Sequence, residues 1–359
     1  MRLNVPTAFS ALSALCRPLG FMSAMAVAAC SSTPPASTTA APAVPAPALA
    51  ALPSSPAPAI KVGIALGGGA AKGFAHIGVI KMLEANGFAP AVVAGTSAGS
   101  VVGALYASGM NAFELQEKAV ALDEAKIRDL QLSSAGLLLG QKLEDYVNEQ
   151  VRRQPLEHLA KPFVAVATRL EDGERTVFAR GNTGQAVRAS SSVPGVFQPV
   201  AIGKYHFVDG GIVSPVPVDA ARQLGADVVV AVDISSKARG QTPAGMLGTL
   251  NQSIAIMGQK LGQAELARAD VIVRPQVLDI GGADFTQRAS AILEGEKAAL
   301  AVMPQIRERI AQLQAARDQA TRLAKQKEAE AQRQACLEQR SRLQKLAGLA
   351  GLDGACPTP

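Results

Sequence analysis

Residues 60–73 read IKVGIALGGGAAKG, and residues 91–99 read AVVAGTSAG. In each stretch, a short apolar run ends at a cluster of small residues, and a segment with helical spacing follows. Strand, glycine-rich turn and helix, repeated in this order, are typical of a parallel sheet that is covered by helices on both faces. These two stretches therefore predict an α/β fold.

Further strands are predicted downstream from short runs of β-branched and aromatic residues, at 163–168, 175–179, 205–208, 227–233 and 271–273. The first two flank an Asp172-Gly173 turn. The middle of the chain, at 111–160, is predicted to be mostly helical, and the chain is expected to be helical again from about residue 286.

The first 29 residues have the layout of a secretory signal peptide, with arginines at 2 and 17 and a short apolar stretch that ends in small residues. Residues 27–30, VAAC, resemble a bacterial lipobox. The resemblance implies cleavage before Cys30 and acylation of that residue, whereas ordinary cleavage near Ala29 is the alternative. Ser31 in place of Asp resembles lipoproteins of the outer membrane, so we expect a lipid-anchored protein that faces the periplasm.

Composition divides the chain into four parts. A signal peptide at 1–29 precedes a tether at 30–59, which is rich in Ser, Thr, Ala and Pro and buries nothing. The folded domain is predicted at 60–304, and a basic helical tail follows at 305–359.

Charge and hydropathy exclude several classes of protein. The chain has 359 residues, of which 48% are hydrophobic and 18% charged, whereas disordered chains combine low hydrophobicity with high net charge. No run reaches the ~18 apolar residues of a spanning helix, so a multi-pass membrane protein is excluded. The tail holds ten basic and six acidic residues and accounts for most of the net charge of +6, so we expect no nucleic-acid partner.

The four cysteines, at 16, 30, 336 and 356, are too scattered for a zinc site, and we expect no metal. A disulfide between Cys336 and Cys356 is allowed in an oxidising compartment.

The glycine loop at 67–73 has three interpretations. A P-loop requires Ser or Thr after its Lys, and Lys72 is followed by Gly73. A dinucleotide site requires an acidic residue at the end of the second strand, where Gly95 stands instead. The third interpretation is an oxyanion hole, in which backbone amides converge on a developing negative charge and Lys72 lies at the mouth. A tight strand–helix turn is the alternative without function, and no cofactor is expected.

Residues 95–99, GTSAG, fit the G-x-S-x-G pattern between a strand and a helix, where a strained turn exposes the serine hydroxyl. Ser97 is therefore the candidate nucleophile, unless this is only a turn of small residues. A serine nucleophile needs a base, and the chain has three histidines. We expect His76 to pack or give polar support, His158 to lie on the surface and His206 to point away from Asp209.

Four segments in order resemble the patatin-like phospholipases: GGGAAKG at 67–73, GTSAG at 95–99, ASSSVPGVFQP at 189–199 and DGG at 209–211. The resemblance covers roughly residues 60–300, and residues 66–80 look particularly like the compact bacterial members. It implies a three-layer α/β/α fold with a mainly parallel sheet, to which this chain adds the helical tail.

The resemblance also implies a Ser–Asp dyad without histidine, with Ser97 as nucleophile and Asp209 as base. Backbone amides near Gly68, Gly69 and Ala70 would form the oxyanion hole. Ala70 stands where many members have a fourth glycine, and Lys72 replaces the commoner Arg. The remaining motif glycines would support the site: Gly67, Gly73, Gly95, Gly99, Gly210 and Gly211.

We therefore expect a membrane-anchored serine acyl-ester hydrolase that acts on phospholipids or lysophospholipids. Two alternatives stay open: a lipoprotein scaffold whose hydrolase body is idle and whose tail binds a partner, and a thioesterase or esterase with a histidine triad.

Overall fold

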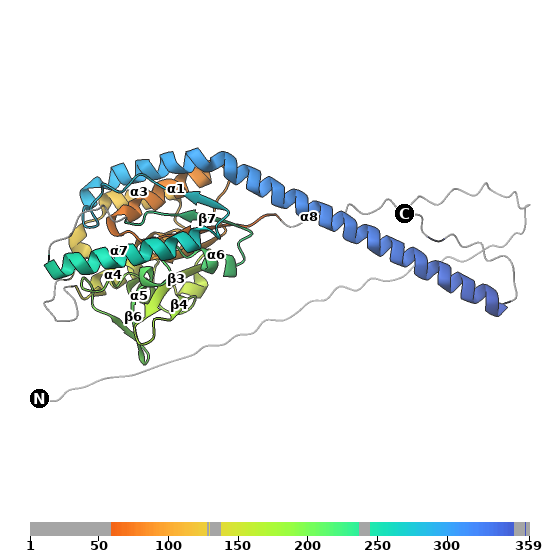
Figure 1. Cartoon of the computed structure of the whole chain (residues 1–359), viewed down its shortest axis with the longest axis horizontal. Coiled ribbons are helices and arrows are strands. Elements are labelled where there is room, and N and C mark those ends of the chain that lie inside the picture. Colours follow the sequence, from red (N-terminus) through yellow and green to blue (C-terminus); the bar gives the residue numbers. More distant parts are fainter. Residues whose placement is uncertain (1–58, 128, 130–137, 237–244, 348–355, 357–359) are drawn as a thin grey trace, which may run out of the picture. The chain divides into compact units, whose positions relative to one another are not determined.

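The computed structural model describes residues 59–127, 129, 138–236, 245–347 and 356 (Figure 1). The chain divides into two units, 1–54 and 55–359, and all described residues belong to the second. The predicted signal peptide with Cys30, and the tether up to residue 58, lie outside the described residues.

The described residues form one sheet of eight strands in the order β5-β6-β3-β2-β1-β7-β8, with β4 paired to β3. Strands β1, β2, β3, β7 and β8 run parallel to one another, whereas β4 and β6 are antiparallel to β3 and β5 is antiparallel to β6. The strands are β1 (Val62–Leu66), β2 (Val92–Thr96), β3 (Phe163–Arg169), β4 (Arg175–Phe178), β5 (Val200–Ile202), β6 (Tyr205–Asp209), β7 (Val228–Val232) and β8 (Val271–Val273).

Eight α-helices accompany these strands within the described part of the chain: α1 (Phe74–Ala85), α2 (Ala98–Ala107), α3 (Ala112–Ala121), α4 (Gln141–Gln150), α5 (Thr183–Ser190), α6 (Val218–Gln223), α7 (Gly245–Leu266) and α8 (Arg288–Ala347). Short 3-10 turns occur at η1 (Ala70–Gly73), η2 (Glu124–Lys126), η3 (Leu156–His158), η4 (Gly210–Ile212) and η5 (Phe285–Gln287). The predicted fold class, a mainly parallel sheet between two helical layers, is confirmed.

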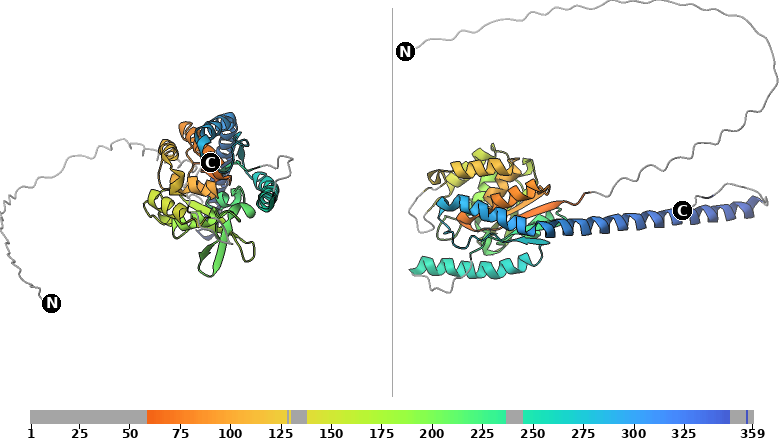
Figure 2. Two further views of the ribbon diagram at one scale, coloured as in Figure 1. Left: turned by 90° about the vertical axis from the view of Figure 1, so that its left-hand side faces the viewer. Right: turned by 90° about the horizontal axis from the view of Figure 1, so that it is seen from above.

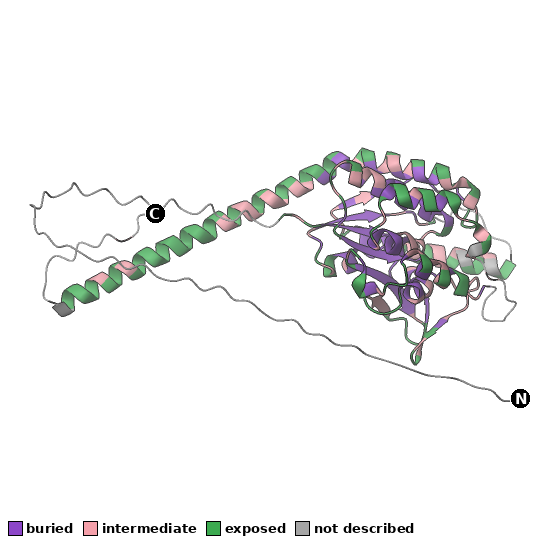
Figure 3. Ribbon diagram, turned by 180° about the vertical axis from the view of Figure 1, so that it is seen from behind, coloured by how far each residue is buried: buried purple, intermediate pink, exposed green. Residues whose placement is uncertain are grey.

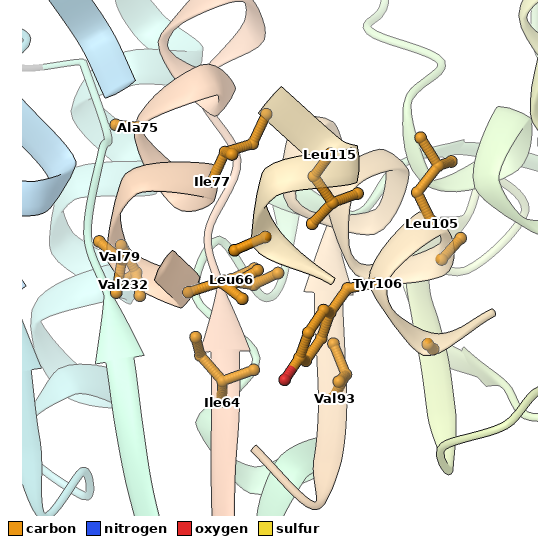
Figure 4. Close-up of a cluster of buried hydrophobic side chains, with 14 of the residues drawn as sticks. Ile64, Leu66, Ala75, Ile77, Val79, Val93, Leu105, Tyr106, Leu115 and Val232 are labelled. Carbon is orange, nitrogen blue, oxygen red and sulfur yellow. The ribbon is translucent and has the colours of Figure 1, made fainter. Parts of the chain in front are cut away.

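Both faces of the sheet are buried. On one face, residues of β1, β2 and β7 such as Ile64 and Val232 pack against α1, α2, α3 and the start of α8 (Figure 4). On the other face, alternate residues such as Ala65 and Val229 pack against α6 and the end of α7. Figure 2 shows α7 well apart from α1 and α3. Because successive side chains of a strand point to opposite faces and both faces are covered, the central strands are apolar throughout.

Helices α1 and α8 pack at very short range because a glycine on each helix removes a side chain from the contact. A Cβ atom added at Gly78 would lie 1.9 Å from the Ile292 carbonyl oxygen, and one at Gly295 would lie 2.0 Å from that of Ala75. Glycine costs helix stability, and here it permits backbone contact between the helices.

The domain boundary predicted at 304/305 lies inside α8, which runs on without a break. Ile306 is fully buried in the main core, and the Arg309 Nε donates to Asp270 Oδ1 at 2.9 Å. The predicted tail thus begins as part of the folded body, and the run of almost entirely exposed residues starts only at 322 and extends to 345 (Figure 3). Cys336 and Cys356 form a disulfide.

In the part of the chain that the structure describes, no helix combines the length and the apolar character needed to cross a membrane.

Candidate active site

Ser97 occupies a strained turn between β2 and α2. Its φ of 54° and ψ of −125° are values that residues other than glycine rarely adopt. The flanking glycines allow the turn to close: a Cβ at Gly95 would lie 2.4 Å from the Gly99 carbonyl oxygen, and one at Gly99 would lie 2.1 Å from that of Leu66. This is the geometry of a nucleophile elbow.

Strand register brings Asp209 to Ser97. Thr96 of β2 pairs with Val166 of β3, and the next residue of β3, Ala167, pairs with Asp209 at the end of β6. The chain then turns against β3, where a Cβ at Gly210 would lie 2.1 Å from the Val166 carbonyl oxygen. As a result, the Ser97 Oγ donates a hydrogen bond of 2.5 Å to Asp209 Oδ2.

Both groups are shielded from water, with Ser97 8% and Asp209 7% exposed. Burial raises the pKa of Asp209 to about 6, although hydrogen bonds from Ser97 and from the Gly211 amide oppose the shift. The Gly211 amide donates to Oδ1 at 2.7 Å, which leaves Oδ2 facing the hydroxyl. The carboxylate is therefore a stronger base than aspartate in water and is still ionised at neutral pH.

None of the three histidines, all of which the structure describes, bonds to Ser97 or Asp209. The His76 ring is fully buried, and its Nε2 lies 2.8 Å from the Gly67 carbonyl oxygen. Burial lowers its pKa to about 4, so it is neutral, and it supports the glycine loop as expected. His206 is exposed beside Glu171, and His158 is exposed in η3. A histidine triad therefore has no imidazole in position.

The glycine loop lies against the elbow, where a Cβ at Gly68 would be 3.2 Å from the Ser97 Cβ. The prediction that the Gly68 amide serves the oxyanion hole is wrong, because this amide donates to the Pro215 carbonyl oxygen at 3.0 Å. Among the described residues, the amides of Gly69 and Ala70 have no acceptor. The same is true of Ala98 at the N-terminus of α2. Its amide is a further candidate donor, which the elbow motif implies.

Lys72 does not lie at the mouth of the site as predicted. Its side chain is only 4% exposed, and the Nζ donates to Ser236 Oγ at 2.7 Å. Lys72 therefore helps to hold the loop rather than to attract an anion. Gly73 allows the loop to touch α2, since a Cβ there would lie 2.7 Å from the Ala98 Cβ.

Ser190, at the end of α5, is a further residue whose role the sequence did not reveal. Its Oγ accepts a hydrogen bond from the Ser97 amide at 3.0 Å and donates one to the Val166 carbonyl oxygen at 2.6 Å. The side chain is fully buried. Ser190 thus satisfies the amide of the strained residue and ties the elbow to β3.

The described residues contain no group of three His, Cys, Asp or Glu side chains that could hold a metal ion.

Comparison with known proteins shows what the part of the chain around this site is similar to. Residues 64–222 match the family model of the patatin-like phospholipases. An uncharacterized NTE family protein of Mycobacterium tuberculosis is 36% identical over 182 residues, which make up 50% of this chain and 51% of that protein. The mouse patatin-like phospholipase domain-containing protein 6 is 31% identical over 184 residues, which are 49% of this chain and 14% of that protein.

The chain thus spans about half, or less, of the length of these curated relatives. Among solved structures, VipD from Legionella pneumophila aligns with a TM-score of 0.48 and 16% identity, over 68% of this chain and 67% of that one. The residues that the family model matches include both Ser97 and Asp209, so these two residues lie in the part of the chain that resembles the patatin-like phospholipases.

Proposed function

We propose that this protein is a serine acyl-ester hydrolase in which Ser97 is the nucleophile and Asp209 the base, and that its substrates are phospholipids or lysophospholipids. The observation that carries the proposal is the hydrogen bond of 2.5 Å between the Ser97 hydroxyl and the buried Asp209 carboxylate. A hydroxyl on a strained elbow, a desolvated base and nearby amides without acceptors together match the requirements of acyl transfer.

In the acylation step, the Ser97 Oγ attacks the ester carbonyl carbon while its proton passes to Asp209 Oδ2. The carbonyl oxygen becomes an oxyanion, which the amides of Gly69, Ala70 and Ala98 are placed to stabilise. Collapse of the tetrahedral intermediate breaks the bond to the alcohol oxygen. Asp209 returns the proton to that oxygen, and the acyl group stays on Ser97.

In the deacylation step, water attacks the acyl-enzyme and Asp209 accepts its proton. The second intermediate collapses, the fatty acid leaves, and Asp209 returns the proton to Ser97 Oγ. One carboxylate thus acts in both steps, and its direct hydrogen bond to the serine removes the need for a histidine between them.

The surface of α7 supports a lipid substrate. This helix contacts η4, which directly follows Asp209, and Gly258 approaches the Gly211 carbonyl oxygen. Its outer side exposes a stripe at near-heptad spacing, and Lys260 is the one ionisable residue between positions 245 and 264. Such a stripe suits contact with a lipid surface. We name these residues the α7 stripe: Met246, Leu250, Met257 and Leu261.

We also propose that the acylated Cys30 anchors the protein to the outer membrane. Support comes from the resemblance of residues 27–30 to a lipobox and from the tether composition that follows. Several acyl chains, at ~0.8 kcal/mol per buried CH₂, would anchor the protein stably.

Removal of either dyad member is expected to abolish turnover. Ser97→Ala and Asp209→Asn should each lower kcat on a short-chain nitrophenyl ester at least ~10³-fold, with an unchanged circular dichroism spectrum. A fluorophosphonate probe should label the wild type but not Ser97→Ala. Ser108→Ala and Asp145→Asn are matched controls away from the site. Wild-type protein that resists the probe would support the idle scaffold instead.

The pH dependence of kcat/KM should report the ionisation of Asp209. Because desolvation raises the pKa of Asp209 to about 6 and the ionised form is the base, kcat/KM should be constant above that pH. Below it, kcat/KM should fall tenfold per pH unit as Asp209 is protonated. Stopped-time assays from pH 4 to 8 measure this limb. A limb near pH 4, the value of an ordinary carboxyl group, would contradict a desolvated base.

The α7 stripe should matter for lipid in vesicles and not for a dissolved ester. Leu250→Asp and Met257→Asp, at positions that are 40% and 49% exposed, should each lower turnover of phosphatidylcholine vesicles roughly tenfold, since each removes an apolar contact of ~1.5 kcal/mol. Turnover of the nitrophenyl ester should stay within twofold. Gln263→Asp adds the same charge away from the stripe as control, and an equal loss there would show that charge alone is responsible.

Replacement of Cys30 should release the protein from membranes. In a bacterial host that acylates lipoproteins, Cys30→Ala should move the protein from the membrane to the soluble fraction, because the acyl chains are lost. Cys16→Ala, within the same predicted signal, is the matched control and should leave fractionation unchanged. A Cys30→Ala protein that still sediments with membranes would rule out this anchor.

A further inference from the structure

Glu265 is a buried carboxylate beside the site that the proposed chemistry does not use. It lies in the last turn of α7 and is 5% exposed. Its Oε1 accepts a hydrogen bond of 2.5 Å from Ser214 Oγ, and its Oε2 accepts one of 2.8 Å from the Val216 amide. Burying a carboxylate away from solvent is costly. A buried carboxylate that bonds twice to one short segment therefore needs a structural or functional reason.

That segment, residues 214–216, is bonded to both halves of the site. The Ser214 carbonyl oxygen accepts from Thr96 Oγ1 at 2.8 Å, and Thr96 directly precedes Ser97. The Pro215 carbonyl oxygen accepts from the Gly68 amide at 3.0 Å, and Gly68 directly precedes Gly69. One short segment thus sets the position of the nucleophile elbow and of the glycine loop.

The same segment is tied to the base. The Ser214 amide donates to the Gly210 carbonyl oxygen at 2.8 Å, one residue beyond Asp209. Residues 214–216 also pack closely against the start of the glycine loop, because a Cβ at Gly67 would lie 3.1 Å from Val216 Cγ2 and 3.2 Å from the Pro215 carbonyl oxygen. A displacement of residues 214–216 would therefore move the elbow, the loop and the base relative to one another.

We infer that Glu265 is a positioning residue, which fixes residues 214–216 and thereby the geometry between the Ser97 hydroxyl and the amides of the glycine loop. The inference rests on the proposed function, because positioning has meaning only for a reaction at Ser97. Hydrogen bonds to an ionised acceptor are shorter and stronger than neutral ones. A misplacement of ~1 Å in such a site can cost ~10²-fold in rate.

The two donors explain why a carboxylate occupies this position. The Ser214 hydroxyl and the Val216 amide both donate, and a carboxylate offers two acceptors. A glutamine keeps both links only if the Ser214 hydroxyl turns and accepts from the glutamine amide. A leucine of similar length keeps neither link.

The test compares Glu265→Leu with Glu265→Gln in the full chain. Glu265→Leu should lower kcat on a short-chain nitrophenyl ester ~10²-fold while KM stays within threefold, and should slow labelling by a fluorophosphonate in parallel. Glu265→Gln should recover kcat to within tenfold of the wild type, with the acid limb of kcat/KM still at the pKa of Asp209. Gln263→Leu, on the exposed side of the same turn, is the control.

Ser214→Ala keeps the inference testable if Glu265→Leu does not fold, because it removes one of the two bonds and buries no new group. It should lower kcat by a smaller factor, and its effect should not add to that of Glu265→Gln, since both act on one bond.

Three results would overturn the inference. The first is a folded Glu265→Leu protein with kcat within twofold of the wild type, and the second is a Ser214→Ala protein with unchanged kcat where Glu265→Leu fails to fold. The third is a Glu265→Gln protein that is as inactive as Asp209→Asn and has lost the acid limb, which would make Glu265 the base. Activity that survives Ser97→Ala would instead refute the proposed function, so the two failures are distinguishable.

Discussion

The hydrogen bond between Ser97 and Asp209 is the interaction on which the rest of the site depends. The two residues are 112 positions apart, and strand register alone brings them together at the level of Ala167. Since neighbouring strands are ~4.8 Å apart, side chains on either side of β3 can meet above it. A slip of one residue would turn one of the two side chains to the other face. The backbone around both residues is closely packed, since a Cβ at Gly95 or Gly210 would lie 2.4 or 2.1 Å from a carbonyl oxygen.

The environment of Asp209 balances two opposing effects. Burial disfavours the charged carboxylate and raises its pKa, whereas the bonds from Ser97 and the Gly211 amide favour it. The net effect is a pKa of about 6. The carboxylate therefore keeps its charge at neutral pH and has a higher proton affinity than an ordinary aspartate. A more polar site would leave a weaker base, and a drier one would leave a neutral acid. In the proposed mechanism, direct contact with Ser97 makes an intermediate histidine unnecessary.

Local sequence patterns predicted the strands and the turn at Ser97. The strands that end at Leu66, Thr96 and Asp209 follow from apolar runs, and the elbow follows from its glycines. The bond of Gly68 to Pro215, the burial of Lys72 and the role of Ser190 could not be predicted, because each depends on a partner more than 90 positions away. The boundary at 304/305 was misplaced because the basic composition of the tail does not show that its helix begins within the folded body.

Lys72 lies in the glycine loop, two residues after Ala70, and its contacts bear on the conformation of that loop. The remaining candidate donors in the loop are the amides of Gly69 and Ala70. Ala70 has a φ of 51°, a conformation that costs of order 1 kcal/mol for a residue with a Cβ. Such strain persists only where the surroundings enforce it. Here the next amide, of Ala71, donates to the Gly282 carbonyl oxygen at 3.0 Å, and Lys72 is fastened to Ser236. The bonds of Ala71 and Lys72 thus fix the residues that directly follow Ala70 and help to hold the loop in this conformation.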